Sequence, residues 1–162
     1  MESLETFEHN GLTIEIYPDD CGESPREWDN LGTMIYAHRR YSLGDEQLDP
    51  EEIREIVKRA DVISLPLYLY DHSGLTMNTT GFSCPWDSGQ VGYIYVTKKK
   101  LREEFCCQRL SKKKIQQALN LLRGEVETYD MYLRGDIYGY VISQPCEKCG
   151  ELEEIDSCWG FY

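Results

Sequence analysis

Residues 111–134 read SKKKIQQALNLLRGEVETYDMYLR and make up the longest periodic segment of the chain. Apolar side chains recur here at spacings of three and four, which is the period of an amphipathic α-helix. We expect a long helix that begins after Ser111, and its apolar face needs another layer to cover it. The apolar positions are Ile115, Ala118, Leu119, Leu122, Val126, Tyr129, Tyr132 and Leu133.

Short segments with strand character lie on both sides of this helix. Some alternate apolar and polar residues, and others are continuous apolar runs rich in β-branched and aromatic side chains. Residues 137–143 and 155–162 predict a hairpin whose two strands are joined by a polar connector. The expected strands are LTIEIY (12–17), TMIYAHRRY (33–41), VISLPLYLY (62–70), VGYIYV (91–96), IYGYVIS (137–143) and IDSCWGFY (155–162).

Two shorter helices complete the pattern. Residues 49–52 (DPEE) have the order of a helix start closed by a capping box, and this helix should end near Asp61. Thr97 is placed to cap the second helix. The expected fold is α+β, with a mostly antiparallel sheet of about five strands packed on one long helix in the C-terminal half, plus two shorter helices, in a single domain over residues 1–162.

Composition and charge narrow the function classes. The chain has 162 residues, of which 41% are hydrophobic and 12% aromatic, too many for a disordered tail. It has no apolar run of about 20 residues and no signal-peptide pattern at its start, so we expect a cytoplasmic protein with no membrane partner. The net charge of −12 disfavours direct binding to nucleic acid and favours a partner with a basic surface.

The acidic residues concentrate in the first third of the chain. Residues 1–61 carry 16 Asp and Glu against 6 Lys and Arg. Carboxylates on a rigid surface can imitate nucleic-acid phosphates, and the alternative is that they serve solubility alone. The predicted partner-binding residues are those on and just before the first short helix, namely Asp45, Glu46, Glu51, Glu52 and Glu55.

The segment between the two central apolar runs, residues 71–92, offers candidates for catalysis. Asp71 or Asp87 could orient His72 as a base, and Ser88 or Cys84 could act as the nucleophile. However, no GxSxG motif surrounds them. The neighbours Asp71, His72 and Ser73 cannot converge on one point from an extended strand, where successive side chains point to opposite faces. The alternative is that these residues satisfy backbone groups of the turns.

Arginine and cysteine side chains suggest two further sites. Arg39 and Arg40 could clamp a phosphate or carboxylate, although local ion pairing with Asp45 and Glu46 is the simpler interpretation. The odd number of cysteines, seven, favours reduced thiols. Zinc is the one candidate cofactor, because Cys146-x2-Cys149 is half of a typical zinc site. Its alternative is a turn that carries free thiols, and the proposed metal ligands are Cys146, Cys149 and Cys158, with Cys84 as a further candidate.

The chain contains three long distinctive strings, LPLYLYDHSGLTMNTTGFSCPWDSGQVGYIYVT (65–97), RGEVETYDMYLRGDIYGYV (123–141) and IDSCWGFY (155–162), with WDNLGTM and HRRYSLGDE upstream. These strings resemble a family of small uncharacterised proteins encoded by bacteriophages. The resemblance implies an accessory phage protein in a bacterial host cell. With the acidic surface, it predicts a non-enzymatic inhibitor of a host defence or nucleic-acid-handling complex, of the anti-restriction or anti-CRISPR type. The alternatives are a small enzyme or ligand-binding protein with a site in residues 71–92, and a virion component.

Overall fold

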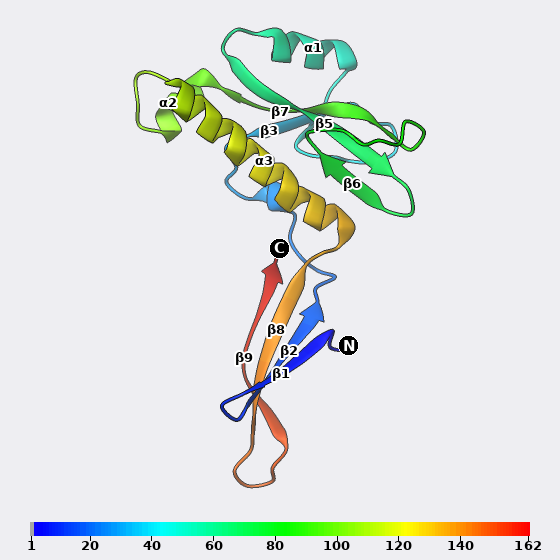
Figure 1. Ribbon diagram of the computed structural model, residues 1–162, viewed down its shortest axis with the longest axis vertical. Helices are drawn as coiled ribbons and strands as arrows, with labels where there is room; N and C mark the ends of the chain where they lie inside the picture. The colour runs from blue at the N-terminus through cyan, green and yellow to red at the C-terminus, as the bar shows by residue number, and fades with distance from the viewer. Residues whose placement is uncertain (1) are drawn as a thin grey trace. The chain divides into compact units, whose positions relative to one another are not determined.

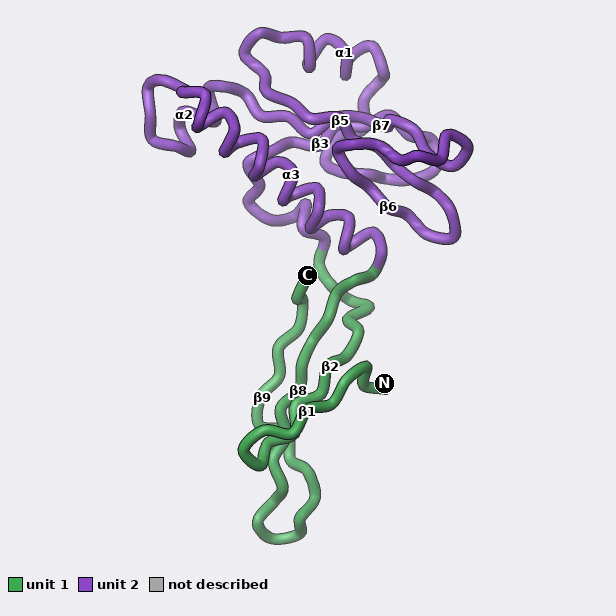
Figure 2. Tube along the Cα trace, in the orientation of Figure 1, with its two compact units in different colours: residues 1–23, 135–162 green, residues 24–134 purple. Residues whose placement is uncertain are grey.

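The computed structural model describes residues 2–162 as an α+β protein with two mostly antiparallel sheets (Figure 1). Its contacts divide the chain into two compact units (Figure 2). The central unit comprises residues 24–134, and the terminal unit is built from both ends of the chain, residues 1–23 and 135–162. The predicted fold class is confirmed, and the single domain over residues 1–162 stays a prediction.

The helices and strands follow the sequence pattern closely. Thr97 caps its helix as predicted, since its hydroxyl accepts a hydrogen bond from the Lys100 N–H at 3.2 Å. Glu52 caps the start of the first helix by accepting the Asp49 N–H at 3.1 Å. The helices are α1 (Pro50–Lys58), α2 (Lys98–Glu104) and α3 (Lys112–Arg134), with a 3-10 turn at Pro25–Glu27. The strands are β1 (Glu5–His9), β2 (Leu12–Pro18), β3 (Thr33–Tyr36), β4 (Glu46–Gln47), β5 (Val62–Asp71), β6 (Leu75–Asn78), β7 (Ser88–Thr97), β8 (Tyr138–Pro145) and β9 (Leu152–Phe161).

The central unit holds a five-stranded sheet in the order β4-β3-β7-β5-β6. Only the short β3–β4 pair is parallel. Pro66 is tolerated in β5 because β6 pairs only with residues 68–71, so the strand has a single partner, β7, at the proline. Figure 1 shows α1 and α3 on opposite faces of this sheet.

The hydrophobic core lies between the central sheet and α3. Leu122, Val126 and Tyr129 of α3 are buried, as the helical spacing of the sequence predicts. They pack with the sheet and with Leu101 of α2 in one cluster. The sheet and loop members of the cluster are Met34, Tyr36, Leu43, Leu67, Leu69, Met77, Ile94 and Val96, and Ala118 completes the helical side.

Tyr129 makes this core sensitive to alkaline pH. Burial, reinforced by the nearby Tyr132, raises the pKa of Tyr129 to about 12. Between pH 10 and 12 the unfolded chain therefore ionises this phenol while the folded chain keeps its proton, and stability falls. We expect wild type to lose roughly 2–3 kcal/mol relative to Tyr129→Phe over this range, measured by urea unfolding at each pH. Parallel pH curves for the two proteins would contradict the prediction.

The terminal unit is a four-stranded antiparallel sheet in the order β1-β2-β8-β9. Directly paired residues share a face, so Phe7, Ile14 and Ile142 form one apolar row, and Ile16 and Tyr140 extend the same face. The residues described in this unit form no helix, and Ile137 is the one apolar side chain among them that is buried. The sheet is thus a single layer without a core of its own.

Several boundaries differ from the sequence prediction. The segment 33–41 is a strand only to Tyr36, and α1 ends at Lys58 rather than near Asp61. Strands β1, β4 and β6 were not predicted, because ETFEH, EQ and LTMN are short and carry little apolar signal. Their pairing with β2, β3 and β5 defines them. Within residues 2–162, none of the helices combines the length and the apolarity that a membrane crossing requires.

Candidate functional site

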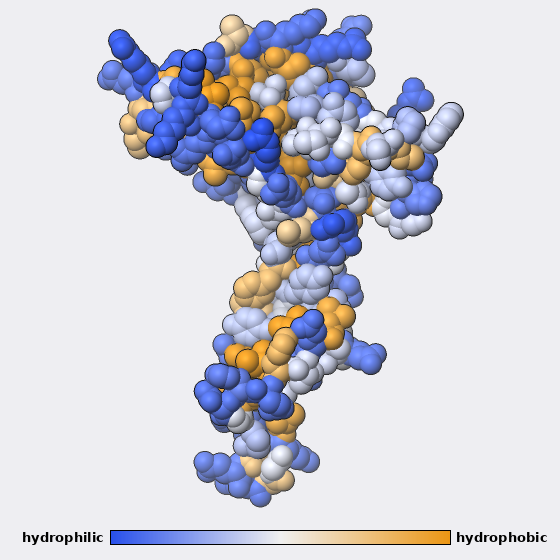
Figure 3. All heavy atoms as spheres, viewed as in Figure 1, coloured by the Kyte–Doolittle hydropathy of each residue, from blue (hydrophilic) through white to orange (hydrophobic). Residues whose placement is uncertain are grey.

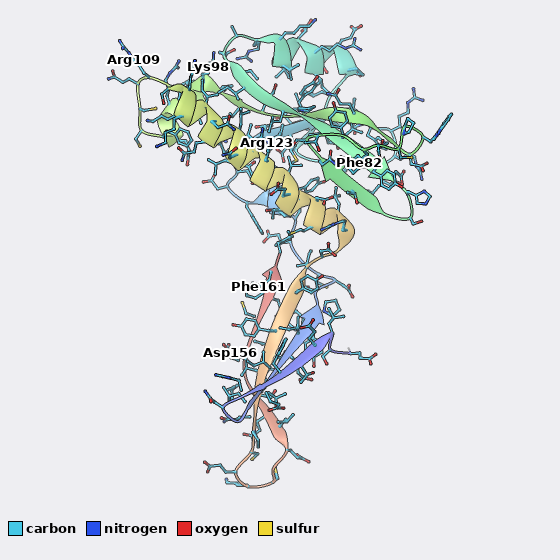
Figure 4. The ribbon with its side chains drawn as sticks, in the orientation of Figure 1. Phe82, Lys98, Arg109, Arg123, Asp156 and Phe161 are labelled. Carbon is cyan, nitrogen blue, oxygen red and sulfur yellow. The ribbon has the colours of Figure 1, made fainter. Side chains whose placement is uncertain are left out.

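The predicted catalytic residues meet at one end of the central sheet, where β5 ends and β7 begins. The backbone N–H of Asp71 donates to the carbonyl of Asp87 at 2.8 Å, so both carboxylates lie on neighbouring segments. At this end of the sheet, the ring of Tyr70 contacts His72 at 5.9 Å and Phe82 at 5.5 Å between centroids. Figure 4 shows Phe82 at this end of the sheet.

The order of the groups differs from that of a nucleophilic site. Oδ2 of Asp87 lies 3.2 Å from Nδ1 of His72 and 3.8 Å from Sγ of Cys84, so the carboxylate stands between the ring and the thiol. Activation needs the base in contact with the nucleophile. The hydroxyl of Ser88 donates instead to the carbonyl of Cys84. The four predicted residues are brought together, but their contacts stabilise the loop and do not place His72 as a base against a nucleophile.

A cavity of about 430 Å³ opens beside these residues. Arg40, Asp71, Asp87 and Ser88 line it, together with residues that sequence reasoning missed, among them His38, Trp86 and Gln90. The Trp86 side chain is 91% exposed. His38 is held in place because its Nδ1 accepts the backbone N–H groups of Arg40 and Tyr41, at 3.3 and 3.2 Å, and its ring stacks on Tyr41. The tryptophan within PWDSG, in a glycine-punctuated loop, was the available signal.

The predicted ion pairs of the arginine segment are wrong. Arg40 is 72% exposed and lies 3.5 Å from Asp71. Asp45 pairs instead with Arg26, at 2.7 Å between Nη2 and Oδ2, and it also accepts the Met34 N–H. Only 23% of the Asp45 side chain is exposed. Asp45 therefore has a structural role, and its part in partner binding stays a prediction. Arg39 is exposed beside Arg40.

The remaining predicted acids are exposed, but the unit that holds them has no net charge. Glu46 lies in β4, and Glu51, Glu52 and Glu55 lie on α1, where Arg54 and Lys58 offset them. The whole central unit carries 16 acidic and 16 basic residues. The terminal unit carries 13 acidic residues and a single base, Lys148, for a charge of −12. The net charge of the protein thus resides in the terminal unit, whose acidic residues come from both ends of the chain.

Apolar side chains accompany the charge of the terminal unit. Phe7 is 50% exposed and lies in the apolar row of the sheet, and Phe161 contacts Tyr140 of the same face at 5.6 Å between ring centroids. Figure 3 shows hydrophobic residues interspersed with hydrophilic ones over these strands. The other large exposed apolar residues of this unit are Leu4, Tyr138, Leu152, Ile155 and Trp159.

The proposed zinc ligands do not gather within one chain. Cys146 and Cys149 lie in the turn between β8 and β9, whereas Cys158 pairs with Tyr140, six residues along β9 from the Pro145–Leu152 pair. At the rise of a strand this separation is about 20 Å. Cys158 is therefore not a third ligand, and no group of three or more metal-binding side chains is found among residues 2–162.

Comparison of the chain with protein-family models, with curated proteins and with solved structures finds no match.

Proposed function

We propose that the protein acts without enzymatic chemistry, as an inhibitor whose terminal unit binds a basic surface of a host defence or nucleic-acid-handling complex. The observation that carries this proposal is the segregation of charge: the net charge is −12 in the terminal unit and zero in the central unit. Such a field accelerates encounter with a basic partner and repels nucleic acid.

The partly exposed apolar row supports a protein partner rather than a small ion. Charge alone gives steering and salt-sensitive association, whereas lasting complexes bury an apolar centre inside a polar rim. Phe7 and Phe161 supply large apolar side chains. Glu5 and Asp156 lie on the same face, opposite Ile16 and Ile142. The expected partner surface is basic at its rim and apolar at its centre. The resemblance to phage proteins supplies the host context.

Removing three exposed carboxylates from the terminal unit tests the proposal. The variant Glu5→Gln, Glu153→Gln, Asp156→Asn is expected to bind the host partner about tenfold more weakly, because each exposed charge contributes a few tenths of a kcal/mol. Wild type immobilised at low salt first captures the partner from bacterial lysate for identification. Binding of the purified partner is then measured by calorimetry across salt concentrations.

The matched control removes three charges from the central unit, as Glu46→Gln, Glu51→Gln, Glu55→Gln. It is expected to bind within twofold of wild type and, like wild type, to raise the plating efficiency of a restriction-sensitive phage on a restricting host, whereas the terminal-unit variant does not. Equal losses in both variants would sink the proposal. So would binding that does not respond to salt.

Ligand binding at the cavity of the central unit is the second candidate function, favoured by the exposed Trp86 beside Arg40 and Asp87. The same assays distinguish it, since Trp86→Ala should leave partner binding and plating efficiency unchanged under the first proposal. Loss of both in Trp86→Ala, with the terminal-unit variant unaffected, would transfer the function to the cavity.

A further inference from the structure

The β8–β9 turn presents two thiols on one side of a closed loop. The Gly150 N–H donates to the Cys146 carbonyl at 2.8 Å, which makes residues 146–150 a single turn of α-helical type. The Cys146 N–H donates to the Glu151 carbonyl at 2.7 Å, and Gly150 takes the left-handed conformation (φ +75°) that lets the chain enter β9. Side chains three residues apart in such a turn lie on the same face, so Cys146 and Cys149 can reach one ion.

These two thiols match half of a tetrahedral zinc site. With Zn–S bonds of about 2.3 Å, two thiolates on one ion stand roughly 3.8 Å apart, within reach of neighbouring side chains on one turn. A structural site takes four ligands. The terminal unit offers Cys158 about 20 Å away, and Cys21 lies past Pro18, which pairs with Tyr138 at the other end of β8. No group of three or more metal-binding side chains is found among residues 2–162, so one chain supplies two thiol ligands.

The turn is open to a second chain. Within the sheet, β2 pairs with β8 only as far as Ser143, so residues 144–152 extend beyond their neighbours, as the ribbon of Figure 1 also shows. Cys149 is exposed. Two such turns can meet end to end without bringing the sheets together.

We propose that the turns of two copies bind one zinc ion through Cys146 and Cys149 of each. The four thiols release their protons to solvent as the metal–sulfur bonds form, and no electrons are transferred. Because each terminal unit carries −12, the copies repel one another without the metal. Added salt screens this repulsion and strengthens the zinc-linked dimer, whereas it weakens binding to a basic partner.

Zinc titration of the full reduced protein, followed by analytical ultracentrifugation and metal analysis, tests the proposal. We expect one zinc per two chains and a mass of twice 18.9 kDa, both reversed by EDTA. Cobalt in place of zinc should give the intense visible bands of tetrahedral thiolate coordination. Cys146→Ser and Cys149→Ser should each abolish zinc retention and the dimer, with circular dichroism unchanged.

Matched controls are Cys158→Ser in the same unit and Cys106→Ser in the central unit, both exposed thiols that should leave zinc stoichiometry and mass unchanged. One zinc per monomer, loss of zinc in Cys158→Ser, or a protein that stays monomeric and metal-free in excess zinc would each overturn the proposal. An isolated Cys146–Cys149 disulfide under reducing conditions, seen as a mass two hydrogens lower, would also overturn it.

Discussion

Replacing Arg26 with methionine is expected to lower the free energy of unfolding by about 3–5 kcal/mol, the usual cost of removing one partner from a buried ion pair. Arg26 is 5% exposed and joins Asp45 through two hydrogen bonds, Nε to Oδ1 at 2.9 Å and Nη2 to Oδ2 at 2.7 Å. Nη1 reaches Glu125 at 3.2 Å, and Nη2 also donates to the Gly32 carbonyl. Burial opposes the charge of Arg26, but the two carboxylates outweigh it and raise the pKa of Arg26.

The cost is high because the carboxylates would remain. Glu125 accepts the backbone N–H groups of Leu31 and Gly32, and Asp45 accepts that of Met34, so neither can turn outward to water without breaking these bonds. The variant would leave two negative charges facing each other across an apolar side chain. Urea unfolding followed by tryptophan fluorescence measures the effect.

Arg59→Met is the matched control. Arg59 also makes a two-bond pair with a carboxylate, Asp61, but both side chains are more than half exposed. The hydrogen bond from Arg59 lowers the pKa of Asp61, yet solvent screens the pair, so the urea midpoint should hardly move. Similar midpoints for the Arg26 and Arg59 variants would show that the buried network is not a stabilising element.

Gly92→Ala is expected to destabilise the protein by about 3 kcal/mol or more, at the upper end of overpacking costs. A Cβ on Gly92 would stand 2.0 Å from the carbonyl oxygen of Ile35 and 2.8 Å from the Tyr36 Cα. Both contacts are with the backbone of β3, which pairs with β7 at this point. No rotamer change can relieve them, so the two strands must separate.

The same substitution at Gly124 should stabilise the protein instead. Gly124 lies inside α3, and a Cβ there meets no atom within 4 Å. Alanine is favoured over glycine in a helix interior by roughly 0.5–1 kcal/mol. Thermal unfolding of both variants and of wild type measures the two changes in stability. Destabilisation by Gly124→Ala, or a neutral Gly92→Ala, would contradict the packing described for the central unit.

Local patterns in the sequence were sufficient to predict most helices and strands. The spacing of Leu122, Val126 and Tyr129 predicts α3 because the burial of one helix face depends only on the helical period. Thr97 and Glu52 predict helix starts because a cap bonds to backbone groups within three residues. Strands β1, β4 and β6 were not predicted, because a short edge strand is defined by its partner, which lies elsewhere in the chain.

The candidate sites depended far more on tertiary structure. Residues Asp71, His72, Asp87 and Ser88 were predicted together because they are close in sequence, but their order around Asp87 follows from the pairing of β5 with β7. Asp45 looked like a surface acid until the fold placed Arg26 against it.

By itself the sequence determined the α+β class, the long helix, the caps and the total charge of −12, because each of these depends on neighbouring residues or on composition. The tertiary structure alone decided where that charge resides. It joins the two ends of the chain into one sheet, so 13 acidic residues from segments far apart in sequence share one unit with a single lysine. Electrostatic and ligand-forming contacts act through space, and the spatial neighbours of a side chain are set by strand pairing rather than by position along the chain.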